Sequence, residues 1–159
     1  MRRFVSWRRR VRPVLLGLLT VYAGLIGLRA LYPIAYTSHI VRLAEEHGLD
    51  PALVAAVVRC ESRFRAEAVS PRGAVGLMQI MPETGTWIAP QLGIVDFGVE
   101  RLTDPVLNLR FGTWYLRHLL DRFGNRNDAL MAYNAGPRNV ETWANDTGTA
   151  FPETRVYVN

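Results

Sequence analysis

Glu61 is the residue whose type and position are best suited to acid–base chemistry, and it ends a long apolar segment. It follows Val57 by four residues and Val58 by three, so in a helix these side chains share one face. Such a face raises the pKa of a carboxyl group because it excludes water, and the negative end of a helix dipole acts in the same direction. A carboxyl group of this kind suits a general acid, but its position alone does not establish that role. The alternative is a surface glutamate that pairs with Arg63 or Arg65.

Two other segments carry groups that could contact a ligand. The first, GAVGLMQIMP (73–82), combines glycines, which allow close approach, with Met78 and Gln79. The amide of Gln79 both donates and accepts hydrogen bonds, as recognition of an N-acetyl group requires, and Met78 offers an adaptable apolar surface. The second, AYNAGP (132–137), ends a helix at a glycine, so Tyr133 and Asn134 either face a cleft or cap that helix. The first segment could equally be a packed loop.

Taken together, these segments resemble the lytic transglycosylases of the soluble type, relatives of goose-type lysozyme in the lysozyme superfamily. The resemblance runs from about Ser38 to the C-terminus. Four motifs carry it in the family's order: ES (61–62), SPRGAVGLMQ (70–79), AYNAG (132–136) and ETRVYV (153–158). The resemblance implies a mainly α, lysozyme-like domain over residues 38–159.

The same resemblance implies a role for individual residues. Glu61 would be the sole catalytic acid/base. The residues implied to hold the substrate or the acid are Ser62, Ser70, Met78, Gln79, Tyr133, Asn134 and Tyr157. The hydroxyl group of Tyr157 is expected to approach the acid, although an ordinary packed aromatic remains the alternative.

The implied reaction is cleavage of the glycan strands of peptidoglycan between N-acetylmuramic acid (MurNAc) and N-acetylglucosamine (GlcNAc), with closure of a 1,6-anhydro ring. No metal or organic cofactor is implied. Two alternatives are a hydrolytic lysozyme, for which Glu67, Glu83 or Asp96 could activate water, and a peptidoglycan-binding protein that does not cut. A third is a small membrane-assembly component, and cell-wall or secretion machinery stays open as a partner.

The N-terminal segment predicts export. Residues 1–12 contain six arginines, and an apolar stretch from Val14 to Tyr32, interrupted by Arg29, follows. Nineteen residues nearly span a bilayer core, and the positive charge stays inside. We therefore expect a cytoplasmic basic segment (1–12), a single-pass anchor (13–32), a linker (33–37) and a domain outside the cytoplasm. A cleaved signal peptide and a buried core helix are the alternatives.

The charge of the remaining chain argues against nucleic acid as a partner. After position 30 the sequence has twelve basic and fourteen acidic residues, although the whole chain carries a net charge of +5. A nucleic-acid-binding domain would instead show basic clusters that neutralise phosphates. Cys60 is the only cysteine, which excludes an intrachain disulfide, and its apolar neighbours predict burial.

Helix start and stop signals organise the domain. Ser38 is expected to cap a first helix that ends at Gly48, and Asp50-Pro51 and Asp104-Pro105 are cap-then-proline signals. Asn127 is expected to begin a further helix that stops near Gly136, and Pro137 another. The stretches 65–76 and 93–104 show no clear period, with a small strand conceivable near Ile94 and Val95. One apolar stripe marks the long central helix: Leu107, Phe111, Tyr115, Leu119 and Phe123.

Overall fold

The computed structural model describes residues 13–24, 36–145 and 157, without the side chains of 144 and 145. The chain divides into two compact units, Met1–Thr37 and Ser38–Asn159. In the first unit, residues 13–24 form a helix. Within the described ranges no helix has both the length and the apolarity needed to cross a membrane. The basic segment 1–12, residues 25–32 of the expected anchor and residues 33–35 of the expected linker lie outside the described residues.

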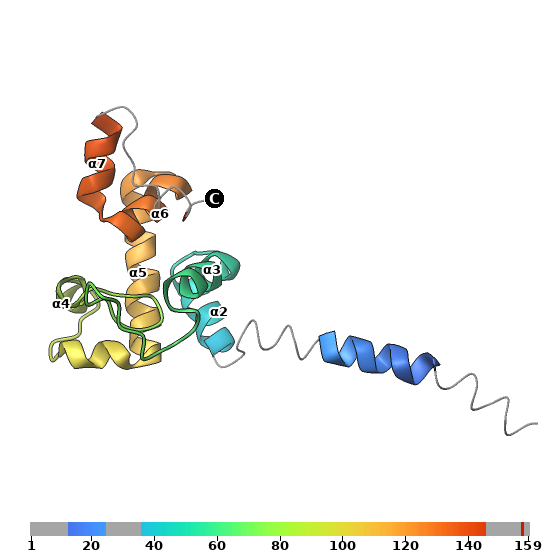
Figure 1. Ribbon diagram of the computed structural model, residues 1–159. Coiled ribbons are helices and arrows are strands. Elements are labelled where there is room, and N and C mark those ends of the chain that lie inside the picture. Colours follow the sequence, from blue (N-terminus) through green and yellow to red (C-terminus); the bar gives the residue numbers. More distant parts are fainter. Residues whose placement is uncertain (1–12, 25–35, 146–156, 158–159) are drawn as a thin grey trace, which may run out of the picture. The chain divides into compact units, whose positions relative to one another are not determined.

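The second unit is mainly helical, as the sequence predicted. Its described helices pack around α5, which runs through the middle of this unit in Figure 1. Helix α6 packs on α5, and α7 packs on α6. The helices are α2 (Thr37–Glu46), α3 (Pro51–Ser62), α4 (Pro82–Gln91), the 3-10 helix η2 (Val99–Thr103), α5 (Pro105–Phe123), α6 (Arg126–Ala135) and α7 (Pro137–Asn145).

The predicted cap-then-proline signals are confirmed at two helices. The Asp50 carboxylate accepts a hydrogen bond from the backbone N–H of Ala52, and α3 begins at the next residue, Pro51. The Asp104 carboxylate accepts from Val106 N and Leu107 N, at 2.9 and 2.8 Å, and α5 follows. These bonds satisfy backbone donors that have no partner inside a helix, which is why the two boundaries are sharp.

Two helix ends differ from the sequence-based prediction. Helix α6 begins at Arg126 rather than Asn127, because the side chain of Asn125 accepts a hydrogen bond from Asp128 N and serves as the cap. Helix α2 begins at Thr37 and ends at Glu46, two residues before Gly48.

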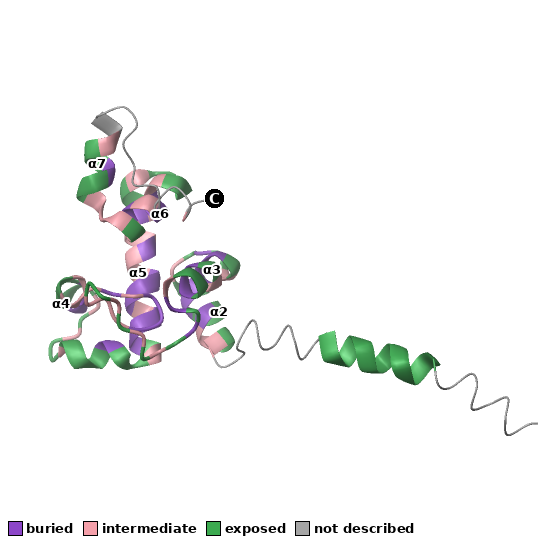
Figure 2. Ribbon diagram, in the orientation of Figure 1, coloured by how far each residue is buried: buried purple, intermediate pink, exposed green. Residues whose placement is uncertain are grey.

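The central helix buries the predicted stripe. Leu107, Phe111 and Leu119 are buried, whereas Tyr115 and Phe123 are half-buried. Figure 2 shows that much of α5 is buried (purple). The half-buried tyrosine lies where the core meets the surface, and the pockets described below open at this point.

Two regions of the domain correct the sequence-based expectations. No strand forms at Ile94 and Val95, where Val95 is fully exposed, and the expected aperiodic stretch instead contains η2. Cys60 is exposed rather than buried. Its position, two residues after buried Val58 and two before buried Ser62, turns it about 200° away from the buried face of α3.

Candidate active site

Glu61 lies in the last turn of α3, half-buried beside the fully buried Val58. The hydroxyl group of Tyr157 donates a hydrogen bond to its Oε1 atom, with 2.7 Å between the oxygens. Burial raises the pKa of the Glu61 carboxyl above its ordinary value of 4.5, and the hydrogen bond from Tyr157 opposes part of that rise. The structure therefore places one carboxyl group in surroundings that favour its protonated form.

Strained backbone is concentrated around this carboxyl. Among the described residues other than glycine, those with positive φ are Arg63 (53°), Phe64 (63°) and Gln79 (48°). Two of them directly follow α3 and turn the chain sharply after Glu61, and the third lies in the segment packed against that turn. Each such residue costs about 1–2 kcal/mol in an L-amino acid. The surrounding structure must hold these conformations in place, which keeps the site rigid.

Ser62 joins the catalytic candidate to the glycine-containing segment. Its side chain is buried, with 1% exposed, and its hydroxyl group donates to Leu77 O at 2.8 Å and to Val58 O at 3.2 Å. The expectation that Ser62 contacts substrate is therefore corrected, because a side chain without exposed surface cannot reach a sugar. Ser62 instead fixes the distance between α3 and residues 77–79.

Met78 is likewise a packing residue. Its side chain is fully buried and fits over Gly112 of α5, where an added Cβ would come within 2.3 Å of its sulfur. The resemblance implied that Met78 holds the substrate, but this side chain has no exposed surface in the structure. Its backbone holds the segment, since Met78 N donates to Asn108 Oδ1 at 2.7 Å and Met78 O accepts from the Tyr133 hydroxyl group at 2.8 Å.

Asn108 is a residue that the sequence reasoning missed. It is fully buried on α5, and its amide nitrogen donates to Val75 O and Leu102 O, both at 2.9 Å. With the bond from Met78 N, one side chain therefore satisfies three backbone groups, two in the segment 73–82 and one in η2. The sequence signal that could have identified it is a polar residue beside the apolar stripe of α5. Such a residue needs hydrogen-bond partners when it is buried.

Gln79 and Ser70 stabilise the segment that carries them. The amide nitrogen of Gln79 donates to Ala68 O at 3.1 Å and to Gly76 O at 2.9 Å. The Ser70 hydroxyl group accepts from Ala74 N at 3.0 Å. Isolated antiparallel bridges pair Val75 with both Val69 and Ile80. Both predicted binding residues thus sit in a short, tightly hydrogen-bonded region.

Tyr133, on α6, lies close enough to Glu61 to feel its charge. Burial raises the pKa of its hydroxyl group well above the ordinary value, and the nearby Glu61 and Tyr115 raise it further. The rings of Tyr133 and Tyr115 lie 5.6 Å apart. Burial also raises the pKa of Tyr157, with added effects from Glu61 and Tyr133. Both tyrosines therefore stay neutral hydrogen-bond donors around Glu61.

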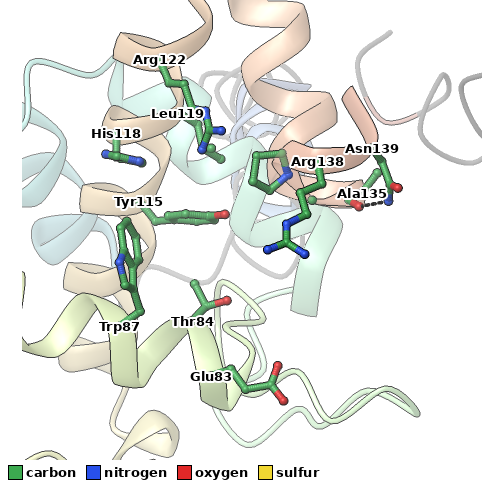
Figure 3. Close-up of a pocket in the computed structure, with 12 residues that line it drawn as sticks. Glu83, Thr84, Trp87, Tyr115, His118, Leu119, Arg122, Ala135, Arg138 and Asn139 are labelled. Carbon is green, nitrogen blue, oxygen red and sulfur yellow. Dashed lines mark hydrogen bonds between the residues drawn. The ribbon is translucent and has the colours of Figure 1, made fainter. Parts of the chain in front are cut away.

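A pocket of about 310 Å³ is lined by three of the predicted binding residues. Gln79, Tyr133 and the exposed Asn134 line it, as do Arg72 and Tyr115. A larger pocket of about 760 Å³ adjoins it between α4, α5 and the start of α7 (Figure 3). A pocket of this size, with converging polar groups and a carboxyl of raised pKa nearby, is the usual setting of an active site.

Other carboxylates could in principle share the chemistry. Glu67, Glu83 and Asp96 are exposed, and Glu83 lines the larger pocket. In the part of the chain that the structure describes, no group of three or more His, Cys, Asp or Glu residues is arranged to hold a metal ion. Glu61 is distinguished from these carboxylates by its burial and by its tyrosine partner.

Comparisons with known proteins agree with this arrangement. Residues 38–155 match the family described as Transglycosylase SLT domain. The soluble lytic murein transglycosylase of Salmonella typhimurium is 37% identical over 158 residues, which cover 88% of this chain and 24% of that protein. The membrane-bound lytic murein transglycosylase C of Actinobacillus pleuropneumoniae is 34% identical over 125 residues, covering 72% of this chain and 33% of that protein. The chain thus spans about a quarter to a third of these relatives.

A solved structure shares the fold as well. The inactive variant of the lytic transglycosylase Slt from Pseudomonas aeruginosa superposes with a TM-score of 0.74 and 37% identity. The matched region covers 82% of this chain and 23% of that one. At this identity, the matched part of the chain shares the architecture of that protein.

Proposed function

Because this chain belongs to the transglycosylase SLT domain family, we propose that it is a lytic transglycosylase of peptidoglycan. It cleaves the β-1,4 bond between MurNAc and GlcNAc and leaves a 1,6-anhydromuramic end. The observation that carries this proposal is the half-buried Glu61 carboxyl, whose pKa is raised by burial and whose Oε1 accepts the Tyr157 hydroxyl group. A protonated carboxyl group that can reach the glycosidic oxygen is what cleavage of a glycosidic bond requires.

One carboxyl group suffices for a balanced reaction. Protonated Glu61 gives its proton to the glycosidic oxygen, the bond from that oxygen to C1 of MurNAc breaks, and GlcNAc leaves with a hydroxyl group. The acetamido oxygen of MurNAc stabilises the positive charge at C1. The Glu61 carboxylate then removes the proton from the C6 hydroxyl group, whose oxygen forms the new bond to C1. Glu61 is protonated again, and no water is consumed.

The tyrosines support this catalytic cycle because their hydroxyl groups stay protonated and neutral. Glu61 alternates between a neutral and a charged form, and the Tyr157 hydroxyl group donates to the carboxylate at 2.7 Å. Burial raises the pKa of Tyr157, so the phenol keeps its proton and does not exchange it with Glu61. We assign Tyr157 to orienting the carboxyl and to limiting how far burial raises its pKa.

The smaller pocket is proposed to hold the MurNAc ring. Gln79 and Asn134 line it with amide groups, and Tyr133 forms its inner side. The amide nitrogen of Gln79 is used by Ala68 O and Gly76 O, so Gln79 offers the acetamido N–H only its oxygen as an acceptor. Ser70 supports this wall by closing the turn at Ala74. The buried Ser62 and Met78 hold the wall in place from behind.

We further place the domain outside the cytoplasm, attached by the N-terminal segment. The support is the sequence, with its six arginines before an apolar stretch, together with the helix at residues 13–24. Apolar residues such as Leu15, Leu16, Leu18 and Leu19 make up most of that helix, as an anchor requires. In this arrangement residues 1–12 stay in the cytoplasm and 13–32 anchor the chain.

The mass of the products tests the proposed reaction. The full chain, solubilised in detergent, is incubated with purified peptidoglycan in water enriched in oxygen-18. We expect muropeptides that are lighter by one water than hydrolysis products and free of the heavy isotope. Hydrated ends that carry oxygen-18 would show a hydrolytic lysozyme instead. Binding without any released fragment would show a peptidoglycan-binding protein that does not cut.

A further inference from the structure

A further pocket, of about 370 Å³, lies beside α4 and shares no lining residue with the two pockets described above. Thr86 is the one lining residue with a polar side chain, and its hydroxyl group donates to Pro82 O at 2.9 Å. The other lining residues come from α4 and from the chain between α4 and η2: Ala89, Pro90, Gly93, Ile94, Val95 and Phe97. The pocket therefore offers a ligand mainly apolar surface, which suits a hydrocarbon side chain rather than a sugar.

Two contacts fix the chain that forms this pocket. Ile94 N donates to Ala89 O at 2.9 Å, which closes the turn after α4. The ring of Phe97 lies 5.1 Å from the ring of Phe111, which is fully buried on α5. The pocket is thus formed before any ligand arrives, and a preformed site costs less ordering on binding than a mobile one.

Val95 adds exposed apolar surface to the pocket. Its side chain is 93% exposed, and its neighbours Ile94 and Phe97 are half-buried. A single exposed valine is common on protein surfaces, but this one is continuous with an apolar pocket in a chain segment of fixed conformation. A partner that covered Val95 and filled the pocket would remove this apolar surface from water, which favours binding.

Carboxylates border the pocket. Asp96 lies between two lining residues, and the carboxylate of Glu100 lies against Gly98. In the part of the chain that the structure describes, neither carboxylate belongs to an ion pair. Arg101 lies nearby and donates to the backbone oxygen of Asp96 at 2.9 Å, but residues 90–104 contain three acidic residues and only this one basic residue. The border is therefore negative, so it attracts cationic groups and repels anionic ones.

We propose that this pocket is the docking site for a segment of a partner protein that inserts a bulky apolar side chain and places an arginine or lysine beside Asp96 and Glu100. The apolar lining selects the inserted side chain, and the negative border selects its cationic neighbour. The same carboxylates would repel an anionic membrane surface or an acidic peptide. The inference goes beyond the proposed function, since none of the lining residues takes part in the proposed reaction.

Peptide selection tests this docking site without reference to cleavage. The full chain, reconstituted in lipid nanodiscs, is used to select peptides from a random dodecapeptide library displayed on phage, after the library has been depleted on empty nanodiscs. We expect the selected peptides to contain a leucine, a phenylalanine or another bulky apolar residue flanked by arginine or lysine. Synthetic copies of these peptides are then titrated against the reconstituted protein by fluorescence anisotropy.

Two variants locate the bound peptide. Thr86→Trp places a large side chain at the pocket and should weaken peptide binding by about tenfold or more. Its matched control is Thr142→Trp, at an exposed helical position of α7 whose hydroxyl group also donates to a backbone oxygen four residues earlier. Asp96→Lys should weaken binding by about three- to tenfold. Glu45→Lys, the same charge reversal at an exposed position of α2, should leave the affinity unchanged.

Each other result would overturn the inference. These results are a selection that enriches no sequence with adjacent apolar and basic residues, and peptides whose affinity is unchanged by Thr86→Trp or by Asp96→Lys. Lipid would be the occupant instead if a fluorescent label at Val95→Cys, in a Cys60→Ser background, were quenched by brominated lipids in the nanodiscs. Thermal unfolding shows whether each variant is folded, and Asp96→Lys, which changes an exposed side chain, decides the question if Thr86→Trp is not.

Discussion

The hydroxyl group of Tyr157 donates a hydrogen bond to Oε1 of Glu61 over 2.7 Å, although 96 residues separate the two in the chain. This contact brings the C-terminal motif to the end of α3. It also sets two opposing effects on one carboxyl, because burial raises the pKa of Glu61 and the tyrosine lowers it. The pH dependence of the protein should therefore report on this pair.

The first prediction concerns the pH profile of cleavage. A general acid must be protonated, so kcat/KM should fall as the pH rises through the raised pKa of Glu61. Tyr157→Phe removes the hydrogen bond that lowers this pKa, so the descending limb should move to higher pH. Release of soluble fragments, followed across pH for both proteins, measures the shift.

The control for this shift is Tyr22→Phe, which removes a hydroxyl group from an exposed tyrosine in the helix of residues 13–24. Tyr22→Phe should leave the descending limb of the kcat/KM profile at the same pH as in the wild type. A limb that stays in place or moves to lower pH in Tyr157→Phe would contradict the role given to this tyrosine.

The second prediction concerns stability in the absence of substrate. The raised pKa of Glu61 means that the folded state holds the proton more tightly than the unfolded state. The resulting stabilisation is complete below the ordinary pKa of 4.5 and is lost as the pH rises through the raised value. Glu61→Gln does not titrate, so its free energy of unfolding should increase relative to the wild type between pH 4 and pH 7. A constant difference, measured with denaturant, would contradict the assigned pKa shift.

The third prediction concerns the buried amide of Asn108. Asn108→Ala leaves Met78 N, Val75 O and Leu102 O without their partner, so it should lower the free energy of unfolding by about 3 kcal/mol or more. Activity should fall with it, because Met78 and its neighbours form the support of the site. Thr142→Ala, which removes one exposed side-chain hydrogen bond, should change stability by only about 0.5 kcal/mol. Equal stability of the two variants would refute the proposed role of Asn108.

The fourth prediction compares two glycines of one loop. Gly73 and Gly76 have nearly the same φ, 85° and 84°, so an alanine at either position carries the left-handed strain of about 1–2 kcal/mol. At Gly73 an added Cβ meets nothing within 4 Å, whereas at Gly76 it lies 2.2 Å from Asn108 Nδ2 and 2.6 Å from Leu102 O.

Gly76→Ala should therefore be the more destabilising of the two, by about a further 1–3 kcal/mol, and should also reduce cleavage. The midpoint of denaturant unfolding gives the comparison directly. If Gly73→Ala lowered the free energy of unfolding as much as Gly76→Ala, the close approach of Asn108 to Gly76 would not contribute to stability.

The sequence predicted the parts of the fold that depend on local signals. Asp50-Pro51 and Asp104-Pro105 locate helix starts because a cap acts within three residues. The apolar stripe of α5 predicted its buried face for the same reason. The approach of Tyr157 to Glu61 spans the whole domain, and only the resemblance to a known family pointed to it.

Other features depend on contacts that no local pattern encodes. Met78 lies in the glycine-containing segment 73–82, and its direction is set by the space above Gly112, thirty-four residues later. Ser62 and Asn108 are buried because Leu77 O and Met78 N need partners there. Cys60 was expected to be buried but is exposed. An apolar sequence segment that forms a helix still turns some of its residues toward solvent. The sequence alone does not distinguish a side chain that supports a site from one that lines it.

The rate at which anhydro ends form in the Glu61→Gln protein tests the central claim most directly. The substitution keeps the size of the side chain and removes the transferable proton, so this rate should fall by about 10²–10⁴-fold. Glu45→Gln, the same change at an exposed position of α2, should keep the wild-type rate. A folded Glu61→Gln protein that releases anhydro ends within a few-fold of the wild-type rate would contradict the assignment of Glu61 as the proton donor.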